Sequence, residues 1–333
     1  MQDATEEVAA AVEQELAQPE EAYQYPPITL LDENTADNYT EVGAELRSNS
    51  QRLAQTLQSF GVDARAPMPV FVPRSFTEWM GDHNAMLTAS DRSRLTKKAV
   101  FFPGCYVNDY DPQTGKDLVF MLEKAGYEVI VPEFECCGLP MVANGFFDDA
   151  RAAASRNVDT LAALVSSGEV PVLTVCPSCQ LMLKQEYAEY FPELGKHESI
   201  VPHVQDACEF LIGLIESGEL DIDVREDATK LVYHAPCHLR AQGIGKPGLD
   251  LLRMASANVE DARSGCCGIS GSYGFKKEKY DVAASVGSDL FKAVKDSAAE
   301  YCVTECGTCR LQISHHTKLP SMHPISWLRK LVK

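Results

Sequence analysis

The order of apolar and polar positions predicts alternating short strands and helices from residue 98 onward. Strand-like apolar runs, each close to a cysteine, are KAVFFPGC (98–105), EVIVPEFECCG (128–138), VPVLTVCPSC (170–179), KLVYHAPC (230–237) and AAEYCVTECGTC (298–309). Apolar residues at helical spacing lie in GKDLVFMLEKAGY (115–127) and GLDLLRMAS (248–256). This alternation is typical of α/β folds with parallel sheets.

The same order of elements occurs twice, which indicates an internal duplication. Cys105 and Cys237 are 132 residues apart, and three further pairs are each 130 residues apart: Cys136 and Cys266, Cys176 and Cys306, Cys179 and Cys309. Similarity at a fixed long offset predicts two copies of one fold. We therefore expect two duplicated, Rossmann-like α/β domains with parallel sheets, at 98–220 and 228–333.

The first third of the chain has a different pattern. Residues 1–66 begin as an acidic polar stretch, continue as an extended linker, and end in an amphipathic helix over 41–60, where apolar residues fall near helical spacing. We expect this segment to be partly disordered and partly helical. Residues 67–97 are interpreted as a connecting segment.

Charge and the absence of sorting signals narrow the function classes. The chain has 30 Lys and Arg against 48 Asp and Glu, a formal charge of -18, which argues against a nucleic-acid-binding surface. Neither a signal peptide nor an apolar run of the ~20 residues needed to cross a bilayer is visible. We therefore expect a cytoplasmic protein, in which twelve cysteines are metal ligands or redox thiols, because disulfides are rare there.

Ten of the cysteines form one spacing pattern that occurs twice: a single Cys, then CCG, then CxxC. The two sets are Cys105, Cys136, Cys137, Cys176, Cys179, and Cys237, Cys266, Cys267, Cys306, Cys309. Five thiolates exceed the four ligands of a structural zinc ion, whereas an iron–sulfur cluster has several irons to ligate. Gly138 and Gly268 can take the positive φ that a tight turn after each adjacent pair needs. The pattern favours iron–sulfur ligation over a zinc site.

Several other residues have plainer interpretations. Cys208 lies in a helical pattern and Cys302 in an apolar strand, so both are expected in the core. His234 and His238, on either side of Cys237, either influence the metal site or serve as polar packing. The run FKKEKY (275–280) is either a docking patch or a solvated helix start.

These motifs resemble a known family. Cys105, then CCG, then CPSC, repeated as Cys237, then CCG, then CGTC, is similar to the cysteine-rich CCG domains of the heterodisulfide reductase B subunit, of glycolate and lactate oxidation complexes, and of the anaerobic glycerol-3-phosphate dehydrogenase C subunit. Segments such as ECCGLPMVANGFFDDAR, YHAPCHL and VTECGTCRLQI look like those of the last-named protein. The resemblance covers roughly residues 67–333.

The resemblance implies two [4Fe-4S] clusters, in some relatives of a non-cubane type, with all ten motif cysteines as ligands. It also implies an electron-transfer role: accepting electrons from a flavoprotein dehydrogenase subunit that holds FAD and oxidises sn-glycerol 3-phosphate, and passing them to membrane quinone. Attachment to the inner face of the cell membrane would be peripheral, through partners. Heterodisulfide-type chemistry at the cluster, and electron transfer in glycolate or lactate oxidation, are the alternatives.

The chain departs from that family at its beginning. Relatives of full length have an N-terminal ferredoxin-like half, whereas residues 1–97 contain no cysteine. Either a separate ferredoxin-like or membrane-anchor subunit supplies those clusters, or the first 66 residues are foreign. Residues 25–66 weakly resemble the segment before the motor of septal DNA translocases, but no phosphate-binding GxxxxGK[ST] loop occurs. Substrate-site motifs are equally absent, so catalysis by this chain alone is not predicted.

Overall fold

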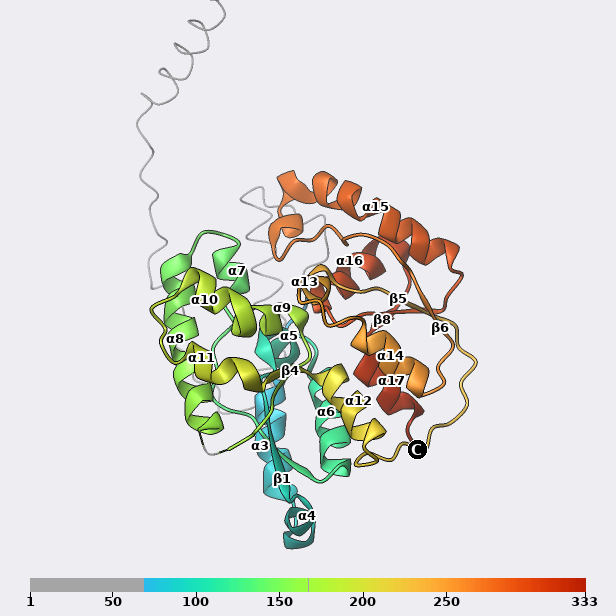
Figure 1. Cartoon of the computed structure of the whole chain (residues 1–333). Helices are drawn as coiled ribbons and strands as arrows, with labels where there is room; N and C mark the ends of the chain where they lie inside the picture. Colours follow the sequence, from blue (N-terminus) through green and yellow to red (C-terminus); the bar gives the residue numbers. More distant parts are fainter. Residues whose placement is uncertain (1–68, 167) are drawn as a thin grey trace, which may run out of the picture. The chain divides into compact units, whose positions relative to one another are not determined.

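The computed structural model describes residues 69–166 and 168–333, and they contain two four-stranded parallel sheets (Figure 1). The first sheet has the order β2-β1-β3-β4 and is built from β1 (Lys97–Phe101), β2 (Tyr127–Ile130), β3 (Val172–Thr174) and β4 (Val204–Asp206). The second has the corresponding order β6-β5-β7-β8, from β5 (Leu231–Tyr233), β6 (Val259–Asp261), β7 (Tyr301–Val303) and β8 (Ser321–Met322). The matching strand order confirms the predicted duplication of an α/β fold.

Helices connect the strands of each sheet. We call β1 to α12 the first module; its helices are α5 (Gly104–Asp109), α6 (Pro112–Lys124), α7 (Leu139–Val142), α8 (Phe147–Val165), α9 (Pro177–Leu181), a π-helical turn Met182–Glu186, α10 (Tyr187–Tyr190), α11 (His197–Ile200), a 3-10 turn Val201–His203 and α12 (Ala207–Glu216). The connecting segment before it contains α3 (Phe76–Met86) and α4 (Ala89–Arg94).

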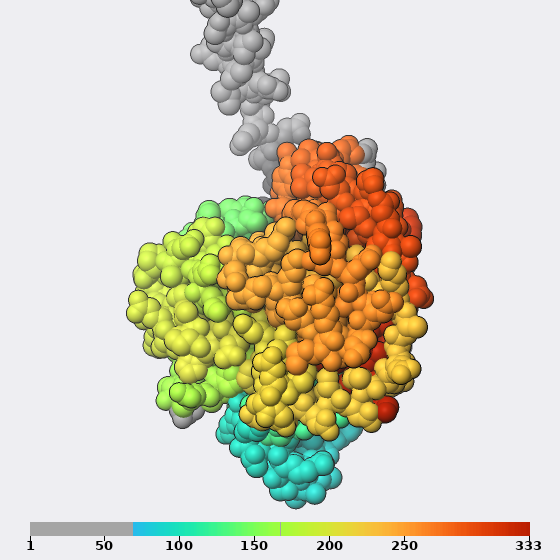
Figure 2. Space-filling model, turned by 45° about the vertical axis from the view of Figure 1, so that its right-hand side comes forward, coloured from blue at the N-terminus to red at the C-terminus, as the bar shows by residue number. Residues whose placement is uncertain are grey.

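The second module runs from β5 to α17 and is shorter. Its helices are α13 (Cys237–Ala241), α14 (Pro247–Met254), 3-10 turns at Tyr273–Phe275 and Lys277–Lys279, α15 (Tyr280–Asp296), α16 (Gly307–Thr317) and α17 (Pro324–Leu331). The run FKKEKY therefore falls on the 3-10 turns that lead into α15. Figure 2 shows the surface of the first module, in green and yellow, continuing directly into the orange surface of the second.

Buried apolar residues explain why the central strands form. Val100 and Phe101 of β1 are fully buried, and β1 pairs in parallel with β3 through Val100 and Val172. Strands covered on both faces need continuous apolar runs, which is the pattern seen in the sequence. The predicted strands and helices of 98–309 are thus confirmed.

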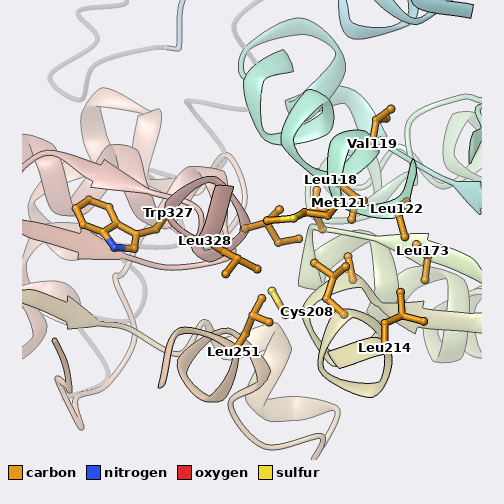
Figure 3. Packing of buried hydrophobic residues seen from close by; sticks show 14 of the residues in the cluster. Leu118, Val119, Met121, Leu122, Leu173, Cys208, Leu214, Leu251, Trp327 and Leu328 are labelled. Atoms are coloured by element: carbon orange, nitrogen blue, oxygen red, sulfur yellow. The ribbon is translucent and has the colours of Figure 1, made fainter. Parts of the chain in front are cut away.

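One hydrophobic cluster joins the modules. Helices α6, α12, α14 and α17 pack against one another, as Figures 1 and 3 show. Cys208 of α12 is 1% exposed and lies near Leu251 of α14 and Leu328 of α17. Cys302 of β7 is also fully buried. The expectation that both cysteines are core residues is confirmed.

Some expectations lie outside what the structure describes. The acidic segment 1–66, its predicted helix over 41–60 and the resemblance of 25–66 to translocases fall on residues outside the described ranges. The domain boundaries 98–220 and 228–333 stay predictions. In the ranges described, no helix is both long and apolar enough to cross a membrane.

Candidate metal centre

The five motif cysteines of the first module lie at the carboxyl edge of its sheet. Cys105 lies in the first turn of α5, shortly after β1. The others lie in the loop after β2 and at the start of α9 after β3: Cys136, Cys137, Cys176 and Cys179. Because neighbouring parallel strands end at the same edge, residues up to 74 positions apart in the sequence meet there.

The sulfur atoms of this first set form a continuous chain of contacts. Sγ of Cys136 lies 3.8 Å from Sγ of Cys105, and Cys136 also contacts its neighbour Cys137. Cys137 contacts Cys179, which contacts Cys176. All of them are free thiols.

The second set repeats this arrangement in the same order. Cys237 contacts Cys266, and Cys266 contacts Cys267. Sγ of Cys267 lies 3.2 Å from Sγ of Cys309, which contacts Cys306 at the start of α16. Each predicted quintet is therefore brought together by its own sheet.

Contacts within each set favour a thiolate at the first cysteine of the CCG motif. Hydrogen bonding with Cys105 lowers the pKa of Cys136 to about 3, while the pKa of Cys105 is raised by the same contact and by burial. The pKa of Cys266 falls to about 2, chiefly through Cys237, whose own pKa is raised. Thiolates are the form of cysteine that ligates metals.

The donor set suits a polynuclear centre. In each set the thiols contact one another, and soft thiolates are the ligands of iron–sulfur clusters. Among the residues described, no three His, Cys, Asp or Glu side chains surround a position for a single metal ion. The chemistry of the thiols fits iron–sulfur ligation.

Glycines shape the backbone around the thiols. Gly138 and Gly268 follow the CCG cysteines with φ of 89° and 83°, as the turn argument predicted. A Cβ on Gly104 would lie 2.7 Å from Sγ of Cys179, so a side chain there would displace that thiol. Glycine at these positions lets the backbone approach the thiols closely.

Both sets face one cavity between the modules. It has a volume of about 290 Å³. Nine of the ten motif cysteines line it, all except Cys136, together with apolar groups such as Tyr106, Leu139, Ile269 and Phe275. Helices α9 and α13, one from each module, lie side by side next to it (Figure 1).

A second, larger hollow reaches the first set from outside. This groove of about 960 Å³ has Cys105 and Cys136 in its lining. Its lining includes the acidic residues Asp109, Glu133, Glu135 and Asp159. The groove gives the first set a route to the protein surface.

The histidines next to Cys237 differ in their surroundings. Nδ1 of His238 lies 2.7 Å from the Ser178 hydroxyl, so His238 joins the two modules by polar packing. His234 is 1% exposed, and its Nε2 has no hydrogen-bonding partner among the described residues. Burial lowers the pKa of His234 to about 4, so it is neutral near pH 7.

Sequence reasoning missed the ion pair that holds the second CxxC against the first module. Nη2 of Arg310 lies 2.7 Å from Oδ2 of Asp111, and the guanidinium carbon is 5.5 Å from the centre of the Tyr106 ring. The Tyr106 ring in turn packs on Gly307, where a Cβ would approach it to 2.3 Å. The only available signal was the position of Arg310 directly after Cys309.

Two buried carboxyl groups at the junction were also not predicted. Burial raises the pKa of Asp206, which caps α12, to about 7, and that of Glu305 to about 8. Glu305 accepts hydrogen bonds from the Tyr233 hydroxyl at 2.7 Å and from the Gly248 amide at 3.2 Å. No local sequence pattern marks either residue as buried.

Comparison with known proteins gives the same two modules. Residues 99–184 and 231–314 each match the family described as "Cysteine-rich domain" (CCG). The chain is 34% identical over 269 residues to the anaerobic glycerol-3-phosphate dehydrogenase C subunit of Escherichia coli K12, covering 80% of this chain and 66% of that protein.

More distant relatives carry other names. The B subunit of a CoM/CoB fumarate reductase from Methanothermobacter marburgensis is 32% identical over 224 residues, which are 64% of this chain and 41% of the relative. Lactate utilization protein A of Bacillus licheniformis is 26% identical over 226 residues, 65% of this chain and 90% of the relative. On these matches, the chain belongs to the CCG family of cysteine-rich proteins and carries the domain twice.

Proposed function

We propose that the chain is an iron–sulfur electron-transfer subunit of a respiratory flavoprotein dehydrogenase, most specifically of an anaerobic sn-glycerol-3-phosphate dehydrogenase. The observation that supports it best is the meeting of five thiols at the same edge of each sheet, with both sets facing one cavity. The 34% identity to one component of that dehydrogenase points to the particular complex.

Two [4Fe-4S] clusters, of cubane or non-cubane type, are the proposed cofactors. Their ligands in this proposal are Cys105, Cys136, Cys137, Cys176, Cys179, Cys237, Cys266, Cys267, Cys306 and Cys309. When bound, an iron–sulfur cluster supplies reversible one-electron chemistry. Cys208 and Cys302 are left out because they lie outside the repeated motif and are buried in the hydrophobic clusters.

The chain's own residues hold, shield and tune the site. Contact with neighbouring thiols lowers the pKa of Cys136 and of Cys266, which favours the thiolate that ligates metals. The amide of Gly268 donates to Sγ of Cys266 at 3.3 Å, and such hydrogen bonds to ligand sulfurs adjust reduction potential. Apolar groups around the shared cavity cover part of both sets.

The proposed partners follow from this role. A flavoprotein subunit with FAD donates electrons, and membrane quinone receives them indirectly through a separate ferredoxin-like or membrane-anchor subunit. The groove that reaches Cys105 and Cys136 offers a place for a redox partner to approach the first set. Attachment to the inner face of the cell membrane is through these partners.

Cluster ligation is tested by anaerobic purification and chemical analysis. We expect about eight irons and about eight acid-labile sulfides per chain, with an EPR signal on reduction. Serine substitution of Cys136 or Cys266 is expected to remove about half of the iron, whereas Cys302→Ser retains all of it. Zinc without acid-labile sulfide would exclude the proposal.

The electron donor is tested separately. The chain is mixed anaerobically with candidate flavoprotein dehydrogenases from the same cells, one at a time, and the substrate of each is added while the EPR signal is followed. Reduction by sn-glycerol 3-phosphate supports the named dehydrogenase. Reduction by lactate or glycolate would instead indicate that the chain serves lactate or glycolate oxidation.

The shared cavity favours one alternative function, disulfide reduction between the two thiol sets. A space of about 290 Å³ lined from both modules could admit a small disulfide. A thiol-forming assay with chemically reduced, iron-loaded protein distinguishes the two functions. Turnover of a small disulfide that stops in both Cys137→Ser and Cys267→Ser variants, whose cysteines line the cavity, would favour the alternative.

A further inference from the structure

A small pocket lies on the second module, next to its thiol set but outside the shared cavity. It has a volume of about 170 Å³ and lies at the ends of β5 and β6. Its charged and polar lining side chains come from separate segments: His234, Arg240, Lys246, Asp261, Arg263 and Ser264. Cavities for drug-sized ligands are roughly 300–1,000 Å³, so this one suits a smaller group.

Positive charge dominates this pocket. Three cationic side chains face one carboxylate, that of Asp261, in a chain whose formal charge is -18. Nζ of Lys246 pairs with Asp261. Arg240 donates only to the Ser264 carbonyl, at 3.2 Å, and within the described residues neither Arg240 nor Arg263 forms an ion pair with a carboxylate. Two guanidinium groups are therefore available to an anion.

A buried histidine lines the same pocket, and one of its ring nitrogens has no partner among the described residues. His234 is 1% exposed, and its Nε2 makes no hydrogen bond to any described residue. Buried polar atoms are nearly always hydrogen-bonded, so the unpaired Nε2 of this pocket-lining histidine indicates a partner that the described residues do not supply. This observation is independent of the arginine charges.

The duplication supplies an internal control for these residues. The corresponding positions of the first module can be counted from its motif cysteines. They contain Phe102, Asn108 and Glu133 in place of His234, Arg240 and Arg263. The first module forms the same sheet with those residues. The fold therefore does not require a histidine and two arginines here.

We propose that this pocket binds a small oxyanion group, such as a phosphate or a carboxylate, between Arg240, Arg263 and His234. Guanidinium groups match the planar or tetrahedral oxygens of such groups in charge and geometry. His234 and Arg263 each lie three residues from a motif cysteine, Cys237 and Cys266. An anion held there would sit beside the second thiol set and change its electrostatic environment.

Binding is measured on the full chain, purified anaerobically in a buffer without phosphate or sulfate. Inorganic phosphate is titrated calorimetrically, with acetate in a parallel experiment. The phosphate arm and the acetate arm separate the two kinds of oxyanion. We expect saturable binding of at least one, weakened about tenfold by Arg263→Ala, because a charge-assisted hydrogen bond is lost.

Matched variants distinguish anion binding in this pocket from nonspecific attraction to positive charge. Arg253→Ala removes an exposed cation of α14 that already pairs with Asp250, and it should leave the affinity unchanged. His234→Phe copies the first module and should weaken binding, while the unfolding midpoint in urea reports whether it folds. Arg263→Glu, which copies Glu133, should abolish binding.

An EPR measurement tests whether an anion in the pocket affects the second thiol set. With iron loaded, the bound anion should shift one part of the EPR spectrum, and the shift should be absent in Arg263→Glu. The proposal is overturned if folded wild-type protein shows no saturable binding, or if Arg263→Ala and Arg253→Ala bind equally. Because calorimetry needs no cluster, these outcomes are independent of whether iron–sulfur ligation is correct.

Discussion

The glycine after each CCG cysteine pair allows a quantitative test of the backbone argument. Gly138 and Gly268 have nearly the same φ, 89° and 83°, so alanine is strained at both. Their surroundings differ. A Cβ on Gly138 would lie 3.4 Å from Cβ of Ala150, whereas one on Gly268 would lie 2.0 Å from the carbonyl oxygen of Ala283 in α15.

The expected costs follow from these distances. Left-handed backbone costs an alanine about 1–2 kcal/mol, and this applies to Gly138→Ala and Gly268→Ala alike. Gly268→Ala must also push α15 away from the loop, which adds about 1–3 kcal/mol as in overpacked cores. Gly145→Ala measures strain alone, because its φ is 84° and nothing lies within 4 Å.

Urea unfolding followed by far-UV circular dichroism gives the free energies of unfolding. We expect Gly145→Ala and Gly138→Ala to lose similar stability and Gly268→Ala to lose clearly more. Gly265→Ala is the neutral control, since nothing lies within 4 Å of its Cβ position and its φ is not positive. Equal losses for Gly138→Ala and Gly268→Ala would refute the reasoning from packing.

Further predictions concern the junction and the core thiols. Arg310→Ala should cost about 1–3 kcal/mol in urea unfolding, because the partly buried Asp111 carboxylate loses its charged partner and keeps the Thr114 hydroxyl as a donor; a loss below about 0.5 kcal/mol would contradict this. Burial raises the pKa of Asp206 from 3.8 to about 7. Between pH 3.8 and pH 7 the folded chain therefore binds a proton that the unfolded chain has lost, and the free energy of unfolding falls as the pH rises through this window. Asp206→Asn keeps the helix cap and should remove about 2–3 kcal/mol of the difference in unfolding free energy between pH 5 and pH 7. If the variant's unfolding free energy depends on pH as the wild type's does, Asp206 is not the group responsible. Cys208→Ala and Cys302→Ala should each lower stability slightly and leave the iron content unchanged, as measured by metal analysis.

The positions of the thiols could be predicted because they depend on local patterns. Apolar runs mark the strands, and each run ends near a cysteine, as in β3, where Cys176 follows two residues after Thr174. Parallel pairing then brings the strand ends to one edge. The two thiol sets could therefore be assigned from the sequence alone.

The junction between the modules could not be predicted in the same way. Arg310 meets Asp111 across 199 positions of sequence, and His323 reaches the carbonyl oxygen of Val175 at 3.0 Å. Such contacts depend on how two complete modules dock, and no spacing within one module specifies that. The charged pocket of the second module was missed because its residues gather only once β5 and β6 are paired.

The two modules also hold their CCG loops by different means, which explains why Gly138 has space and Gly268 has none. In the first module Asn157 of α8 fills the gap: its Nδ2 donates to the carbonyl oxygens of Glu135 and Cys136, at 3.2 and 3.3 Å. The residue 130 positions later is Gly287 of α15, where a Cβ would lie 2.6 Å from the carbonyl oxygen of Cys267. Without a side chain there, the helix approaches the loop directly. Exchanging Asn157 for glycine would therefore leave a cavity and unpaired carbonyls, and exchanging Gly287 for asparagine would force the loop and helix apart, although the two positions correspond.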